Sequence, residues 1–236
     1  MAIKLAQVVP FGRSLGEYQA MFALSPHDRS KRILGVGDGP ASFNAEMTAL
    51  GHGVVSVDPL YELTGQDIQR QFEAVVDGIM AQVISTPADW VWTYHASPAA
   101  LRANRIAALE TFLADYDLGK FQQRYVIGEL PKISQLPNMS FDLALCSHFL
   151  FLYADQFNLE FHQAALMDML HMAPEVRVFP LMTLQGQRSA YVEPLRRYVR
   201  EQGCEVGIQP VRYELQRGGN EMLWIRRPRP EACVRC

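Results

Sequence analysis

Residues 32–59 contain a strand, a glycine-rich turn, a helix and a second strand in direct succession. The apolar run that begins at Ile33 ends in glycines at alternate positions, namely Gly35, Gly37 and Gly39. The next helix is predicted from about Pro40 to Leu50, because proline is accepted in a first helical turn and Gly51 can end the helix. A second buried run then ends on Asp58 and Pro59. Two short strands joined by a helix favour a parallel sheet.

The rest of the chain continues this alternation of short apolar runs with helical patterns. Further strands are predicted over 125–128, 141–146 and 176–181, helices over 156–172 and 191–202, and a terminal strand pair over 205–215 and 221–226. This order predicts an α/β fold: a doubly wound, mostly parallel seven-stranded sheet with an antiparallel C-terminal strand.

Two helical segments lie outside this alternation. Residues 1–30 are expected to form an N-terminal helical cover, since Ser14 and Glu17 have the spacing of a capping box. Residues 60–124 are expected to form a helical insertion between strands 2 and 3, longer than one crossover helix needs. Residues 1–227 are therefore interpreted as one domain, and residues 228–236 as a flexible tail.

Composition narrows the function classes. The net charge is −3, with Arg-rich residues 226–236 offset by a more acidic remainder, so a nucleic-acid partner is not expected. No apolar stretch approaches the roughly 18 residues that a membrane span needs, and the start resembles no secretory signal. Four cysteines do not form a disulfide framework. These features favour a cytoplasmic protein that acts on a small molecule, of unknown oligomeric state.

The glycine turn and Asp58 together indicate a nucleoside-containing ligand. Glycines let the backbone approach a ligand closely, and a carboxylate at the end of the next strand can accept hydrogen bonds from ribose hydroxyls. Both nicotinamide and adenosyl cofactors use this arrangement. The dinucleotide pattern lacks its third glycine, because the position falls on Pro40 or Ser42, and no lysine of the P-loop kind follows. Asp58 could alternatively be only a turn residue before Pro59.

The chain resembles the class I S-adenosylmethionine-dependent methyltransferases in three stretches. They are the glycine motif 33–41, the strand end 54–59, and Gly128-Glu129-Leu130 with the later run from Leu136 to His148. That last run is similar to the pattern of small-molecule and quinone-type members. The resemblance implies methyl transfer from S-adenosylmethionine to a small-molecule acceptor.

The resemblance also implies site residues. The implied cofactor-binding residues are Arg13, Gly35, Gly37, Asp38, Gly39, Asp58, Pro59, Glu129, Leu130, Cys146 and Ser147. Among them, Asp58 would hold the ribose, Glu129 would read the adenine amino group and Arg13 would fold over the cofactor carboxylate. His148 is the candidate base for an acceptor hydroxyl, or else a histidine packed at a strand end. Tyr153, Arg188 and Tyr191 are candidate substrate residues.

The glycine motif departs from the family at two positions. Gly35 stands where many members carry an acid, and Ala41 stands where they carry a third glycine. Asp38 could replace the missing carboxylate or be only a turn residue. The departures leave open a non-catalytic protein that binds S-adenosylmethionine or S-adenosylhomocysteine, and a nicotinamide-dependent oxidoreductase is the remaining alternative. No metal is expected, since Cys233 and Cys236 form a lone pair without the four ligands of a structural zinc site.

Overall fold

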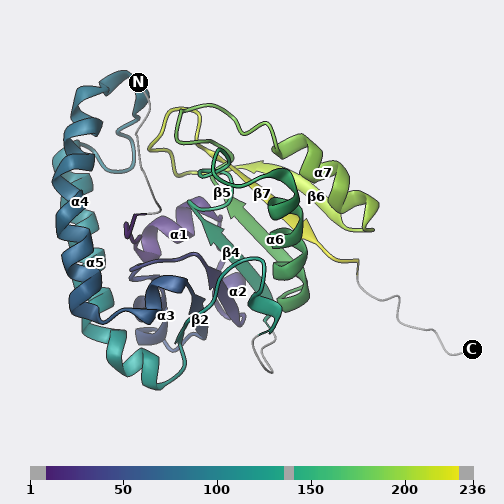
Figure 1. The fold of residues 1–236 in the computed structure, drawn as a ribbon, viewed down its shortest axis with the longest axis horizontal. Coiled ribbons are helices and arrows are strands. Elements are labelled where there is room, and N and C mark those ends of the chain that lie inside the picture. The colour runs from purple at the N-terminus through teal and green to yellow at the C-terminus, as the bar shows by residue number, and fades with distance from the viewer. Residues whose placement is uncertain (1–8, 136–140, 229–236) are drawn as a thin grey trace, which may run out of the picture.

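The computed structural model describes residues 9–135 and 141–228, and its centre is a seven-stranded sheet. The strand order is β3-β2-β1-β4-β5-β7-β6 (Figure 1). Strands β1 to β5 pair in parallel, and β7 runs antiparallel to both of its neighbours. The prediction of a mostly parallel seven-stranded sheet with an antiparallel C-terminal strand is confirmed. The sequence did not predict that β7 would insert between β5 and β6.

The strands are short, and the central ones are buried along their whole length. They comprise β1 (Ile33–Val36), β2 (Val54–Val57), β3 (Tyr125–Val126), β4 (Leu143–Ser147), β5 (Glu175–Phe179), β6 (Glu205–Pro210) and β7 (Glu221–Arg226). Every residue of β1, β4 and β5 is buried. This pattern is typical of parallel strands covered by helices on both faces.

The helices are α1 (Leu15–Met21), α2 (Pro26–Arg29), α3 (Phe43–Ala49), α4 (Gly65–Ser85), α5 (Pro98–Phe121), α6 (Leu159–Met172) and α7 (Val192–Glu201). The capping box predicted at Ser14 and Glu17 is present at the start of α1. The prediction for α3 was wrong at its start, because the helix begins at Phe43 and not near Pro40. The backbone at Pro40 packs against Gly12, where an added Cβ would lie 1.9 Å from the Pro40 carbonyl oxygen. The glycine turn therefore extends past Pro40, and α3 begins three residues later than predicted.

Two apolar clusters cover the two faces of the sheet. Helices α6 and α7 pack on one face through residues such as Leu166 and Leu195, together with Leu34 and Cys146 of the strands. Helices α1 and α3 pack on the other face through residues such as Tyr18 and Phe43. The faces alternate residue by residue along each strand, so neighbouring positions of β4 belong to different clusters.

The segment between β2 and β3 is helical, as predicted for residues 60–124. Helices α4 and α5 lie side by side at one end of the molecule, beside α3 and the β3 edge (Figure 1). They form a third apolar cluster with residues such as Phe72, Phe112 and Tyr125. The insertion thereby has a core of its own, which holds it against the edge of the sheet.

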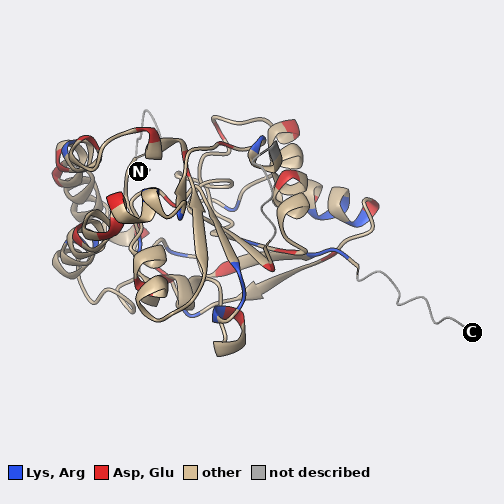
Figure 2. Ribbon diagram, turned by 90° about the horizontal axis from the view of Figure 1, so that it is seen from below, with Lys and Arg blue, Asp and Glu red and all other residues tan. Residues whose placement is uncertain are grey.

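Acidic and basic residues are interspersed along the outer helices (Figure 2). Over the residues that the structure describes, no helix combines the length and apolar character needed to cross a membrane. Residues 229–236 of the predicted tail, with Cys233 and Cys236, and residues 136–140 of the run that ends at His148 lie outside the described residues.

Candidate functional site

A cavity of about 620 Å³ opens at the carboxyl ends of β1, β2 and β4. In open α/β sheets, ligands bind outside the carboxyl ends of the strands, where the strand order reverses. Here β2 and β4 flank β1, so the reversal lies at the cavity. Its volume falls within the range of about 300–1,000 Å³ that is usual for small-molecule sites. The cavity is therefore the candidate functional site.

The glycine turn after β1 forms the floor of this cavity. Gly37 and Gly39 both have positive φ angles, +68° and +54°. An added Cβ at Gly37 would lie 3.3 Å from Phe149, whereas one at Gly39 would meet no atom within 4 Å. The backbone at Gly39 thus faces open space in the cavity, where a side chain would occupy volume available to a ligand.

Asp58 and Tyr61 hold the turn in place. The Gly39 amide donates to Asp58 Oδ2 at 2.8 Å, and Tyr61 Oη donates to the Gly39 carbonyl oxygen at 2.8 Å. The second oxygen of Asp58 accepts from the Leu60 amide at 2.8 Å. Burial raises the pKa of Asp58. Each carboxylate oxygen still has a further lone pair, so Asp58 lines the cavity with acceptor capacity for a ligand.

The side chain of Asp38 turns away from the open part of the turn and into the protein. Tyr18 Oη donates to its Oδ1 at 2.6 Å, and Ser56 Oγ donates to its Oδ2 at 2.7 Å. An added Cβ at Gly35 would lie 1.8 Å from Asp38 Oδ2, so the missing side chain of Gly35 makes room for this carboxylate. The missing side chain at Gly35 and the buried carboxylate of Asp38 therefore belong to one packing arrangement. Asp38 is thus a buried carboxylate beside Gly35, and each of its oxygens accepts a hydrogen bond from a side-chain hydroxyl.

Arg13 brings a cation to the cavity wall. Its Nη1 donates to the Phe11 carbonyl oxygen at 2.7 Å, and its buried Nε has no hydrogen-bond partner. Burial, with Arg105 as a second cause, lowers the pKa of Arg13. The close approach of Gly12 to Pro40 fixes the segment before α1 against the glycine turn. A guanidinium with an unused buried donor, close to the turn, is a ready partner for an anionic group.

Ser147 and His148 reach the cavity from the end of β4. His148 adopts a left-handed backbone conformation with φ +51°, which is uncommon outside glycine. Its Nδ1 lies 3.0 Å from Ser147 Oγ, and its ring packs edge-on against Phe179. Burial, and then the charges of Arg13 and Arg105, hold the pKa of His148 well below its usual range. This lowered pKa favours the neutral imidazole, in which one ring nitrogen is a hydrogen-bond acceptor.

The remaining predicted residues divide between the cavity wall and other places. Pro59, Glu129, Leu130 and Tyr153 line the cavity. Glu129 lies on the outer side, where it forms an ion pair with Lys132 at 3.7 Å. Leu130 is buried against the core cluster of α6 and α7, so it presents an apolar surface beside Glu129.

Three predicted positions are corrected by the structure. Cys146 faces the core of α6 and α7 and not the cavity, because side chains alternate along β4 and Ser147 takes the other face. Arg188 is half exposed outside the cavity and pairs with Glu221. Tyr191 precedes α7 and packs against His162 with ring centroids 4.9 Å apart.

Sequence reasoning missed a buried charged cluster at the cavity, to whose lining Arg105 and Tyr213 contribute. Arg105 of α5 binds both carboxylate oxygens of Glu17 at 2.6 and 2.7 Å, and Glu17 Oε1 also accepts from Tyr213 Oη at 3.0 Å. His95 Nε2 lies 3.1 Å from the same oxygen. This group, called here the Glu17 cluster (Glu17, His95, Arg105 and Tyr213), joins α1, the insertion and the C-terminal segment. The available signal was an arginine on the buried stripe of α5, between Leu101 and Leu109.

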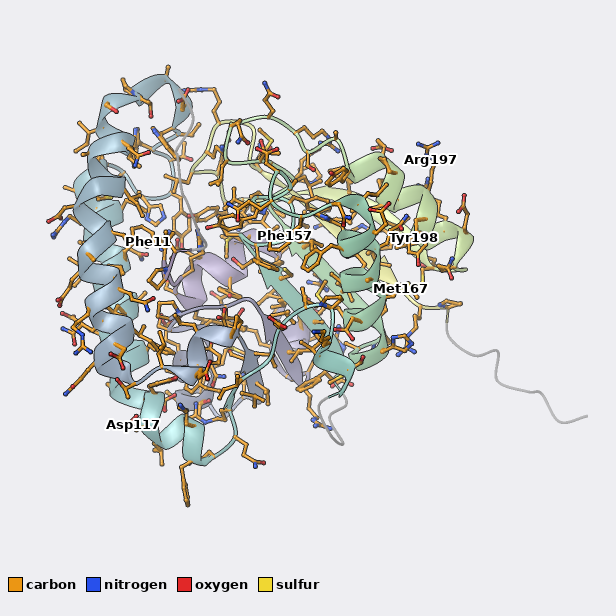
Figure 3. All side chains as sticks on the ribbon, in the orientation of Figure 1. Phe11, Asp117, Phe157, Met167, Arg197 and Tyr198 are labelled. Carbon is orange, nitrogen blue, oxygen red and sulfur yellow. The ribbon has the colours of Figure 1, made fainter. Side chains whose placement is uncertain are left out.

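Sequence reasoning also missed much of the apolar wall. Phe11 lies on the side of α4 and α5 and Phe157 on the side of α6, and both line the cavity (Figure 3). Phe157 stacks on Phe161 with ring centroids 4.3 Å apart and contacts Phe149 at 5.6 Å. These rings come from segments that local periodicity does not bring together. Within the described ranges, no group of three His, Cys, Asp or Glu side chains is placed to hold a metal ion.

No protein-family model matches this chain. The chain is 28% identical over 226 residues to an uncharacterized protein of Methanocaldococcus jannaschii, a match that covers 95% of this chain and 99% of that protein.

Among solved structures, a TehB-like SAM-dependent methyltransferase from Corynebacterium glutamicum aligns with a TM-score of 0.48 and 14% identity, covering 91% of this chain and 88% of that chain. Magnesium protoporphyrin IX methyltransferase from Synechocystis with bound SAM aligns with a TM-score of 0.42 and 12% identity, covering 84% of this chain and 71% of that one. A putative RNA methyltransferase from Pyrococcus horikoshii aligns with a TM-score of 0.44 and 11% identity, covering 90% of this chain and 84% of that one.

Proposed function

We propose that this protein binds S-adenosylmethionine in the cavity and transfers its methyl group to an apolar small-molecule acceptor. The observation that carries the proposal is the buried Arg13 Nε, which has no hydrogen-bond partner, beside a glycine turn whose open face is bordered by Asp58. A ligand that joins a ribose to an amino-acid carboxylate satisfies both groups at once. A nicotinamide cofactor would present its diphosphate to Arg13 instead, and the titration below separates the two ligands.

The residues present fit an adenosyl cofactor at each part of the molecule. Asp58 has lone pairs for ribose hydroxyls, and Gly39 leaves the space beside them open. Glu129 can accept a hydrogen bond from an adenine amino group, while Leu130 offers an apolar surface to the ring. Arg13 can bind the carboxylate with a charge-assisted hydrogen bond.

When bound, S-adenosylmethionine would supply the methyl group of its sulfonium sulfur to an acceptor atom in line with the breaking carbon–sulfur bond, and the thioether S-adenosylhomocysteine would be the leaving group. The chain's own residues then have to exclude water and hold the acceptor. The aromatic wall of Phe149, Phe157 and Phe161 suits an apolar acceptor. If the acceptor atom is a hydroxyl oxygen, the neutral imidazole of His148 accepts its proton at Nε2 as the new bond forms.

Calorimetric titration of the purified protein with S-adenosylhomocysteine tests the proposal. We expect binding in the micromolar range and no comparable heat from NAD or NADP. Asp58→Ala should abolish this binding because it removes the ribose acceptor. Absence of binding at millimolar S-adenosylhomocysteine would overturn the proposal, and binding of a nicotinamide cofactor instead would replace it.

A second titration isolates Arg13. In Arg13→Met, affinity for S-adenosylhomocysteine should fall by roughly 10- to 150-fold, the value of a hydrogen bond to a charged group of about 1.5–3 kcal/mol. Methylthioadenosine has the same nucleoside without the amino-acid carboxylate, so it serves as the matched control. Equal losses for the two ligands would show that Arg13 does not bind the carboxylate.

A further inference from the structure

The cavity continues along α4, away from Asp58. Helix α4 begins a few residues after Asp58, and its 21 residues span about 30 Å. Pro59, before the helix, lines the cavity, and so do Ile79 and Val83 on its later turns. The connection from α4 to α5 lies at the end of the helix pair that is away from α3 (Figure 1). The cavity therefore has a second end, separate from the one that Asp58 borders.

Three segments that are distant in the sequence close this second end. They are residues 86–91, 183–184 and 215–219, called here the far wall. The Val91 amide donates to the Leu215 carbonyl oxygen at 2.8 Å, and Gln216 Nε2 donates to the Thr183 carbonyl oxygen at 3.0 Å. The far wall is therefore one hydrogen-bonded unit, built from the insertion, the loop after β5 and the loop before β7.

Arg217 fixes the insertion side of the far wall. Its backbone amide donates to the Asp89 carbonyl oxygen at 2.8 Å. Its side chain donates to the two neighbouring carbonyl oxygens, from Nε to Ala88 at 2.8 Å and from Nη2 to Trp90 at 3.2 Å. The Trp90 indole nitrogen donates in turn to Thr86 Oγ1 at 3.0 Å. Hydrogen bonds to its backbone and to its ring thus hold Trp90 in place at the cavity.

The second end of the cavity also adjoins His148. Tyr213 lies two residues before Leu215 on the same segment, and its ring centroid lies 6.3 Å from that of His148. Both Tyr213 and Leu215 line the cavity. A molecule that lies against the far wall can therefore place one of its atoms beside the imidazole that is the candidate base.

Six apolar side chains border the second end. They are Ile79, Val83, Trp90, Leu101, Leu184 and Leu215. Arg105, one turn along α5 from Leu101, already binds both carboxylate oxygens of Glu17. Among the described residues at this end, a charged ligand would find no free counter-charge, and burial of an unpaired charge is costly. This end of the cavity therefore favours a neutral molecule.

Gln216 adds one polar group to this surface. The Thr183 carbonyl oxygen only accepts, so the side-chain nitrogen of Gln216 must face it. The side-chain oxygen, Oε1, accepts no hydrogen bond from the residues that the structure describes. Because Gln216 lines the cavity, Oε1 is available to a hydrogen-bond donor of a ligand.

We propose that the second end of the cavity is the acceptor subsite, and that the acceptor is a neutral, flat molecule whose O–H or N–H group donates to Gln216 Oε1. Trp90 and Leu215 give the subsite its apolar surface, and a flat ring packs on the indole of Trp90. Arg217 is a positioning residue, because it acts through Trp90. The inference rests on the proposed function, since a methyl donor in the cavity requires an acceptor beside it.

Indole is a suitable probe, because it is neutral, flat and apolar and carries one N–H donor. Methyl NMR of the ligand-free protein locates it, with Ile79→Val and Leu215→Ile to assign the signals. We expect indole to shift the methyl signals of Ile79 and Leu215, and S-adenosylhomocysteine to shift those of Leu60 and Leu130 near Asp58. If millimolar indole left Ile79 and Leu215 unchanged, or shifted only Leu60 and Leu130, the acceptor subsite would be overturned.

Two analogues test the ligand class by calorimetry. 1-Methylindole lacks the donor, so its affinity for the wild type should be roughly 2- to 12-fold lower than that of indole, as for the loss of one hydrogen bond. That difference should disappear in Gln216→Leu. Indole-3-acetate carries a carboxylate and should bind more weakly than indole. Equal affinities for indole and 1-methylindole, or tighter binding of indole-3-acetate, would overturn the proposed acceptor class.

Arg217→Met tests the positioning role. The substitution frees the carbonyl oxygens of Ala88 and Trp90, so the affinity for indole should fall several-fold, while the affinity for S-adenosylhomocysteine should stay that of the wild type. Arg212→Met changes an exposed arginine on the same loop and is the matched control, in which neither affinity should change. Unchanged affinity for indole in Arg217→Met, or an equal loss for both ligands, would overturn the positioning role.

The probe and the cofactor product are titrated separately, so the two proposals can fail separately. If S-adenosylhomocysteine does not bind but indole shifts Ile79 and Leu215, the proposed function is overturned, although the site for a neutral ligand stands. If S-adenosylhomocysteine binds and indole does not reach the far wall, cofactor binding stands and the acceptor subsite is overturned.

Discussion

Asp38 and Glu17 are both buried carboxylates, one packed against α1 and the other part of it, yet the groups around them differ. Asp38 accepts hydrogen bonds from the hydroxyls of Tyr18 and Ser56, and burial raises its pKa to about 6. For Glu17, burial acts in the same direction, but Arg105 and His95 hold its pKa well below the usual range. Neutral donors organise a carboxylate without stabilising its charge as strongly as a buried guanidinium does. Three predictions test this comparison, and a fourth tests the exposed Arg188.

The largest effect is expected at the Glu17 cluster. Arg105→Met leaves a buried carboxylate without its cation, so the free energy of unfolding should fall by about 3–5 kcal/mol in urea denaturation. Arg102→Met on the same helix is the matched control, because Arg102 pairs with Asp77 at the surface and should contribute at most about 1 kcal/mol. Similar losses in the two variants would contradict the distinction between the buried and the exposed pair.

The pH dependence of stability should have opposite signs at the two carboxylates. The pKa of Asp38 is about 6 in the folded protein and ordinarily 3.8, so the native state holds this proton more tightly between these values. The stability difference between wild type and Asp38→Asn should therefore fall as pH rises from about 4 to 6, by up to about 3 kcal/mol. The stability difference between wild type and Glu17→Gln should instead decrease as the pH is lowered through and below 4.5, because the folded state holds the pKa of Glu17 below its usual value. If urea titrations across this pH range showed both stability differences changing in the same direction with pH, the opposite pKa shifts of Asp38 and Glu17 would be refuted.

Gly35→Ala tests the fit between the first glycine and Asp38. The new Cβ would lie 1.8 Å from Asp38 Oδ2, and overpacking of this kind costs about 1–3 kcal/mol. In an Asp38→Ala background the same change should cost much less, since the carboxylate is gone. A double-mutant cycle measured by thermal or urea unfolding gives the interaction free energy between positions 35 and 38, and additive effects would show that the two residues do not interact.

The smallest effect is expected at Arg188, which the sequence placed at the substrate. Arg188→Ala breaks only a half-exposed ion pair with Glu221 and should change stability by at most about 1 kcal/mol. Affinity for S-adenosylhomocysteine in calorimetry should remain that of the wild type. A clear loss of affinity would return Arg188 to the candidate site.

Local sequence patterns predicted the elements of the fold well. The glycine turn, Asp58 and the capping box at Ser14 lie where periodicity and turn chemistry put them, because each depends on residues close in sequence. The start of α3 was misplaced, since the approach of Gly12 to Pro40 joins segments that are distant along the chain. The residues at which helices begin and end depend on such contacts as much as on local propensity.

The candidate site was predicted unevenly for the same reason. Asp58, Ser147 and His148 follow strands, and the carboxyl ends of parallel strands meet at one edge of the sheet. Arg188 and Tyr191 follow β5 as well, but tertiary contacts with Glu221 and His162 hold them elsewhere. Pattern alone could not distinguish these two groups.

The sequence by itself determined the alternation of strands and helices, the antiparallel C-terminal strand and the position of the glycine turn. Only the tertiary structure decided that Asp38 would fill the space left by Gly35, and that Glu17 and Arg105 would meet across 88 residues. The physical reason is that secondary structure depends on periodicity and turns within a few residues, whereas a buried charge must find its partners wherever the packed chain brings them.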